Sequence, residues 1–138
     1  MLPWVIRFIA VAIVGLCLFL QFKVCGGWFT IIGIVLWPLV GLTHLVAHSI
    51  KLPRSGKIQG SRLALITVSH LLFVVAFLLQ YDQGDGPGWL TITALLGDSQ
   101  VVGSKQPPEW WPDELKENFV LFIPVFVTWV LLLTLPGK

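Results

Sequence analysis

Four long apolar stretches alternate with shorter polar or turn-rich segments along the chain. They cover residues 4–22, 28–50, 62–80 and 112–135. At about 1.5 Å per helical residue, each can cross a hydrocarbon core of roughly 30 Å. The pattern predicts an all-α integral membrane protein, with four transmembrane helices in a single domain that spans residues 1–138.

The connections between these stretches differ in length. Gly26-Gly27 gives a tight hairpin between the first two helices, and residues 51–61 form a loop interrupted by proline and glycine. Residues 81–111 form a long outer loop. Within it, residues 89–96 have apolar positions at helical spacing, which indicates a short interfacial helix, although their threonine and isoleucine content also permits a strand.

The second helix has two different faces. At 100° per residue, one face carries Thr30, Gly33, Trp37, Gly41, His44, His48 and Lys51, and the opposite face is aliphatic. In lipid, this split predicts one face toward protein and one toward lipid. We expect the Gly33/Trp37/Gly41 part of the polar face to contact other membrane subunits. Pro38 and Pro124 are expected to bend their helices.

Composition and charge agree with a membrane location and suggest an orientation. Hydrophobic residues make up 56% of the chain and charged residues only 12%, against about 25% charged residues in soluble domains. All seven acidic residues lie between Asp82 and Glu117, and four of the nine basic residues lie within residues 51–62. The positive-inside rule therefore predicts that the 51–62 loop and both termini are cytoplasmic, with residues 81–117 outside.

Catalytic motifs are absent from the sequence. It contains no H-E-x-x-H, no G-x-S-x-G and no pair of carboxylates within an apolar stretch. Cys17 and Cys25 do not form a C-x-x-C motif, so we expect no metal site from them. The sequence predicts a protein that is not an enzyme and has no nucleic-acid partner.

The three histidines are the candidate ligand-binding residues, because imidazoles within apolar helices are costly to place. His44 lies about 9 Å along its helix from Ile50, and His70 lies about 12 Å from Arg62, so the two share a similar depth. This geometry predicts axial ligands for haem, or two ligands for a chlorophyll-type pigment or a metal ion. His48, one turn nearer the cytoplasmic side, would lie beside a propionate or a head group.

A simpler interpretation gives the histidines no ligand. Their rings would then hydrogen-bond to hydroxyl groups of neighbouring serines and threonines or to backbone carbonyls. The candidates on the two helices are Thr43, Ser49, Thr67 and Ser69.

The leading functional hypothesis is a small non-catalytic integral-membrane subunit of a larger complex, for example an energy-transducing one. Its partners would be the bilayer and other subunits, which would contact the Gly33/Trp37/Gly41 face and the acidic outer loop. Two alternatives stay open. One is a haem- or pigment-binding protein that uses His44 and His70. The other is a small oligomeric transporter, although the helices lack the intramembrane acid that proton coupling usually needs.

Overall fold

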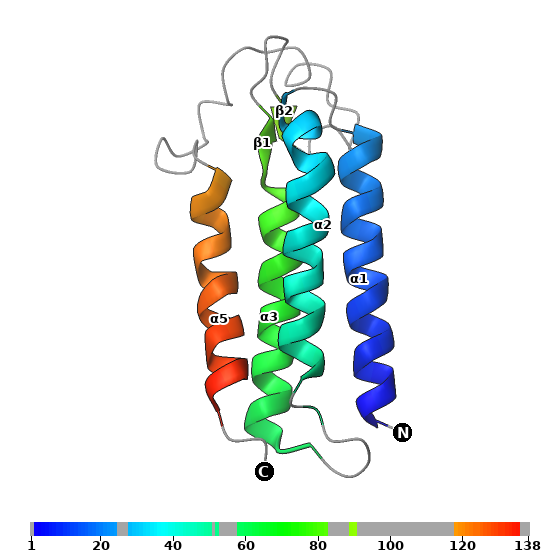
Figure 1. Ribbon diagram of the computed structural model, residues 1–138. Coiled ribbons are helices and arrows are strands. Elements are labelled where there is room, and N and C mark those ends of the chain that lie inside the picture. Colours follow the sequence, from blue (N-terminus) through cyan, green and yellow to red (C-terminus); the bar gives the residue numbers. More distant parts are fainter. Residues whose placement is uncertain are drawn as a thin grey trace.

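The protein is a bundle of helices, seen in a computed structural model that describes residues 2–24, 28–50, 52, 58–82, 89–90 and 118–135 (Figure 1). Side chains are described for residues 3–21, 33–50, 52, 58–80 and 120–135. The elements in chain order are α1 (Leu2–Val24), α2 (Trp28–Ser49), α3 (Gly60–Leu78), β1 (Tyr81–Asp82), β2 (Trp89–Leu90), the 3-10 helix η2 (Asn118–Phe122) and α5 (Ile123–Thr134).

Successive helices run antiparallel along the bundle, so α1 and α3 point one way and α2 and α5 point the other (Figure 1). α1 packs against α2 and α3, and α5 packs against α3 and α2. The start of α1, the end of α2, the start of α3 and the end of α5 all lie at one end of the bundle, which we call the basic end because residues 51–62 connect α2 to α3 there.

Three of the predicted helices begin and end within two residues of their expected positions. The fourth differs, because the chain forms a 3-10 helix over Asn118–Phe122 and becomes α-helical only at Ile123. Pro124 lies in the first turn of α5, where its missing N–H costs no intrahelical bond, so it starts this helix rather than bending its middle. Residues 112–117 of the predicted helix lie outside the described residues.

Two further expectations concern local structure. α2 continues from Trp28 to Ser49 with Pro38 inside it. Trp89 and Leu90 are extended and pair antiparallel with Asp82 and Tyr81, so the interfacial helix predicted over residues 89–96 does not begin at Trp89. Residues 91–96 lie outside the described part of the chain.

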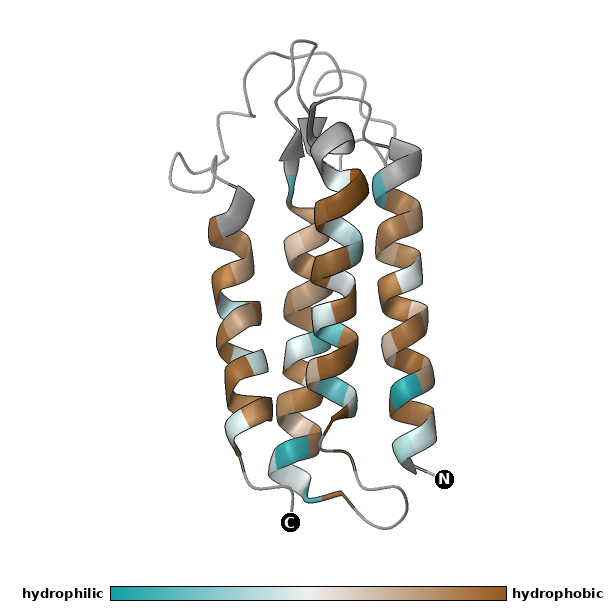
Figure 2. Cartoon of the chain, viewed as in Figure 1, coloured by the Kyte–Doolittle hydropathy of each residue, from teal (hydrophilic) through white to brown (hydrophobic). Residues whose placement is uncertain are grey.

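Two helices of the described structure are long and apolar enough to cross a membrane, Pro3–Gln21 and Gly60–Leu78. Gly33–Ser49 and Val120–Thr134 are shorter apolar helices. Hydrophobic residues extend along all of the helices, and polar residues interrupt them at a few levels (Figure 2). The chain is therefore helical, with at least two candidate spans.

The interior of the bundle contains three successive layers. An aromatic layer lies farther from the basic end and includes Trp37, Phe77 and Phe122. A polar layer of histidines follows. An apolar layer closes the basic end, and its buried members are Ile6, Leu52, Ile66 and Leu132. Buried Arg62 lies at this end, where its Nη2 is 3.4 Å from the backbone oxygen of Leu132.

The predicted partner-binding face of α2 lies inside this bundle. Gly33, Trp37 and Gly41 are all buried within the single chain. A Cβ atom added to Gly41 would lie 2.7 Å from Cγ1 of Val14 on α1, so α1 itself occupies the space beside this face. Helices of the same chain therefore pack against this part of α2, and its contact with another subunit stays a prediction.

Candidate functional site

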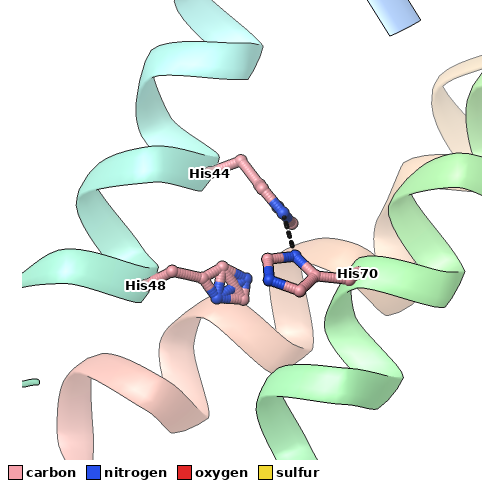
Figure 3. A group of neighbouring side chains, drawn as sticks. All are labelled: His44, His48 and His70. Atoms are coloured by element: carbon pink, nitrogen blue, oxygen red, sulfur yellow. Dashed lines mark hydrogen bonds between the residues drawn. The ribbon is translucent and has the colours of Figure 1, made fainter. Parts of the chain in front are cut away.

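Three buried histidines meet at the centre of the bundle (Figure 3). His44 and His48 are four residues apart on α2, so their side chains project from the same face on successive turns. α3 runs antiparallel beside α2 and brings His70 between them. One ring nitrogen from each residue lies within 4.8 Å of those of the other two. We call these residues the histidine cluster.

The rings touch one another closely. The ring centroids of His44 and His48 are 4.2 Å apart, as are those of His48 and His70. The His44 ring also stacks on Phe73, with centroids 4.1 Å apart and planes inclined by 29°. The cluster is therefore a packed part of the core, and Phe73 covers one face of the His44 ring.

A chain of hydrogen bonds runs through part of the cluster. Trp129 Nε1–H on α5 donates to His44 Nδ1 over 2.9 Å, and His44 Nε2 lies 2.8 Å from His70 Nδ1. An indole nitrogen can only donate, so Nδ1 of His44 must accept. The neutral His44 ring then carries its proton on Nε2 and donates it to His70 Nδ1. By the same reasoning, neutral His70 carries its proton on Nε2.

Three nitrogen atoms of the cluster have no hydrogen-bond partner among the described residues. They are Nε2 of His70 and both Nδ1 and Nε2 of His48. Buried polar atoms are nearly always hydrogen-bonded, and leaving one unpaired costs about 1–3 kcal/mol. Among the described residues, therefore, only half of the ring nitrogens of the cluster have a hydrogen-bond partner. The unpaired nitrogens lie where His70 faces His48 (Figure 3).

The neighbouring hydroxyl groups do not complete the cluster. Thr43 Oγ1 and Thr67 Oγ1 bond to backbone carbonyls in their own helices, at Leu39 and Leu63. Ser69 Oγ instead lies 2.8 Å from Thr128 Oγ1, a contact that joins α3 to α5. These three hydroxyl groups therefore do not play the part expected of them as partners for the imidazoles.

The predicted pairing of His44 with His70 agrees with their positions, but the pair does not fit a haem iron between them. Two axial imidazoles would need their nitrogens about 4 Å apart, twice a metal–nitrogen bond of about 2.0 Å, with the macrocycle in the intervening plane. Here the two nitrogens are 2.8 Å apart and share a hydrogen bond. His48, expected beside a propionate, contacts both other rings directly.

A single metal ion fits the same residues better. Three imidazole nitrogens around one ion lie about 3.3–3.5 Å from one another when each bond is about 2.0 Å. The ligand atoms of the cluster already lie within 4.8 Å of one another, and all three residues are buried. Small side-chain movements would therefore suffice. The sequence analysis raised His44 and His70 as two possible metal ligands, but it placed His48 one turn away and did not combine all three.

The contribution of Trp129 was missing from the sequence prediction. It lies 85 residues from His44 along the chain, beyond the long connection. The available signal was the spacing of the buried positions Val125, Thr128, Trp129 and Leu132 on α5, which follows the helical period and predicts an inward face. No protein-family model, curated protein sequence or solved structure matches the chain.

Proposed function

We propose that the chain is a small integral-membrane protein whose four helices all cross the bilayer. The observation that carries this proposal is the distribution of polar and apolar side chains. Large hydrophobic residues face outward on every helix, among them Phe8 (75% exposed), Val35 (66%), Leu71 (61%) and Val130 (58%). Histidine, arginine, serine and glutamine side chains are buried. This arrangement suits a hydrocarbon solvent and not water.

Helix lengths support four crossings. At about 1.5 Å per residue, α1, α2 and α3 are about 35, 33 and 29 Å long, close to a hydrocarbon core of about 30 Å. α5 alone is only about 18 Å long. With η2, which rises by about 2 Å per residue, the combined segment reaches roughly 28 Å. The 3-10 helix thus extends the fourth segment to a membrane-spanning length.

Orientation follows from charge. We place the basic end, both termini and residues 51–62 on the cytoplasmic side, and residues 81–117 outside. Four basic residues fall within residues 51–62 of the sequence, and all seven acidic residues fall between Asp82 and Glu117. Short loops rich in lysine and arginine remain on the cytoplasmic side.

Within the membrane, we propose that the chain acts as a non-catalytic subunit of a larger complex. The outward face of α1 supports this role. Exposed Phe8 and Phe19 lie on either side of Ala12 and Gly15, and a Cβ atom added to Gly15 would meet nothing within 4 Å. Small residues between large ones allow another helix to approach closely, and such contacts drive helix association in lipid.

Two measurements test these proposals. Single cysteines introduced at Ser55 and Gly103, in a chain lacking Cys17 and Cys25, should be labelled from opposite sides of sealed vesicles by a membrane-impermeant maleimide. Labelling from the same side would exclude the topology. For the complex, Gly15→Leu should release the chain from a larger assembly on a native gel, whereas Val130→Leu on α5 should not. A wild-type chain that migrates alone would exclude the subunit role.

A second candidate function is ligand binding, and the histidine cluster favours it. The haem or pigment form of this hypothesis is disfavoured by the 2.8 Å distance between His44 Nε2 and His70 Nδ1. No macrocycle fits between two rings that are this close. The transporter alternative predicts a homo-oligomer that moves a solute. Uptake by vesicles that contain only this chain would support that alternative.

A further inference from the structure

The histidine cluster has a feature that the subunit role does not explain. It contains buried imidazoles on two helices, and three of their nitrogen atoms have no partner among the described residues. His44 is completely buried and His48 is 2% exposed, so bulk water does not reach these rings. Apolar side chains would fill the same space without leaving buried polar atoms unpaired. Packing alone therefore does not explain three histidines here.

We propose that His44, His48 and His70 bind one copper(I) ion. Each residue supplies one neutral imidazole nitrogen, and imidazole is a good ligand for copper, zinc, iron and nickel. The ligand atoms lie within 4.8 Å of one another, so a three-coordinate site needs only small side-chain rotations. The proposal depends on the burial of the cluster and does not depend on the presence of a partner subunit.

Charge selects the monovalent ion. The seven acidic residues all lie between Asp82 and Glu117, and α3 ends at Leu78, about 12 Å beyond His70 along the helix. The side chains that the structure describes include no Asp or Glu, so the described ligands of the site are all neutral, and the Arg62 guanidinium acts on His48. Dehydrating an ion costs more as its charge rises, and a nearby guanidinium repels a divalent ion more strongly than copper(I), so these surroundings favour the monovalent ion.

Trp129 holds the cluster in its metal-free arrangement. When His44 Nε2 binds a metal ion, the neutral ring must carry its proton on Nδ1. That N–H would then face the N–H of Trp129, where Nδ1 now accepts a hydrogen bond over 2.9 Å. Copper binding must therefore break this hydrogen bond. Trp129→Phe removes the competing donor, and the variant should bind copper more tightly than the wild type.

The test uses the full chain with Cys17→Ala and Cys25→Ala, which removes the thiols that would otherwise bind copper(I). The protein is purified in mild detergent and titrated with copper(I) under reducing, oxygen-free conditions against the chelator bathocuproine disulfonate. We expect one copper(I) per chain. His48→Gln and His70→Gln should each lower the affinity by at least about 100-fold. Trp129→Phe should raise it by about two- to tenfold.

A matched control and a second measurement keep the test independent of folding defects. Thr43→Ala alters an exposed hydroxyl group beside the cluster that bonds to a carbonyl of its own helix, so it should leave the affinity unchanged. X-ray absorption of the loaded chain with intact histidines should show imidazole scattering at a copper–nitrogen distance of about 2.0 Å.

Several results would overturn the assignment. One is a chain that takes up no copper(I) at all. A second is a copper(I) affinity that His48→Gln and His70→Gln leave unchanged. A third is an X-ray absorption spectrum of the loaded chain that shows no imidazole scattering. Zinc(II) bound as tightly as copper(I) would overturn the choice of a monovalent ion. A weaker affinity in Trp129→Phe would overturn the role given to Trp129.

Discussion

Trp129 Nε1 lies 2.9 Å from His44 Nδ1, and this hydrogen bond fixes which nitrogen of His44 carries the proton. The tautomer of His70 follows from it through the 2.8 Å contact between the two histidines. A residue on the last helix thus sets the chemistry of side chains on the second and third. Trp129 cannot accept a proton from His44, so the chain of hydrogen bonds ends there and orders the rings without conducting protons through the bundle.

Removing this donor should change both tautomer and stability. In Trp129→Phe, His44 Nδ1 loses its partner, and we expect the metal-free chain to be destabilised by about 1–3 kcal/mol. Nitrogen NMR shifts of the His44 ring should move from a single tautomer toward a mixture. Trp4→Phe is the matched control, because Trp4 is 67% exposed and should leave both measurements unchanged. An unaltered His44 spectrum in Trp129→Phe would contradict the proposed control of the tautomer.

Close approach of α1 and α2 should make Gly41 sensitive to substitution. Gly41→Ala places a Cβ atom 2.7 Å from Cγ1 of Val14, and overpacking of this kind costs about 1–3 kcal/mol. Thermal unfolding in detergent measures the loss, which Val14→Ala should partly restore in the double variant. Gly15→Ala, where the added atom meets nothing within 4 Å, should be neutral or slightly stabilising. Equal losses at both glycines would argue against this packing.

The hydroxyl contact between α3 and α5 should contribute a measurable coupling energy. Thr128 Oγ1 lies 2.8 Å from Ser69 Oγ in the buried interface. Interhelical hydrogen bonds in membrane proteins contribute about 0.6 kcal/mol on average and at most about 1.7 kcal/mol. A double-mutant cycle of Ser69→Ala and Thr128→Val should return a value in this range. Additive losses would show that the two hydroxyl groups do not support each other.

A lysine on the outward face of α5 tests the membrane location directly. Val127 is 52% exposed near the middle of the combined η2–α5 segment. Lysine at the centre of a membrane helix costs about 2.5–3.5 kcal/mol, so Val127→Lys should impair insertion in a glycosylation-mapping assay. Leu135→Lys is the control, because a lysine at the helix end reaches the interface and should be tolerated. Normal insertion of Val127→Lys would count against a fourth spanning helix.

The sequence carried enough information to pair two of the three site histidines. Helix rise and a short connection place His44 and His70 at similar depth, and these local quantities are preserved in the fold. The position of Trp129 could not be obtained in this way, because the long segment over residues 81–117 leaves the axial register of the last helix relative to His44 undetermined. Only tertiary packing brings this ring to His44.

The sequence also did not show whether a protein-facing surface of a helix contacts another subunit or the same chain. The face with Gly33, Trp37 and Gly41 was correctly recognised as facing protein, but it packs against the chain's own helices. In lipid, the outer surface and the packed interior of a bundle are both apolar, so hydrophobicity does not separate a partner-facing surface from an internal one. The fourth helix was also predicted as one continuous α-helix, whereas residues 118–122 form a 3-10 helix and Pro124 occupies the first turn of α5.

A cavity between α1 and α3 has a consequence for how the cluster could exchange a ligand. It has a volume of about 390 Å³, and its walls are apolar except for Thr67 and His70. Along the bundle axis, the aromatic layer covers the histidines on one side and Ile66 and Leu132 cover them on the other. This cavity therefore offers a sideways approach to His70, within the plane of the proposed membrane. Whatever lies against α1 and α3, lipid or a neighbouring helix, would regulate that approach.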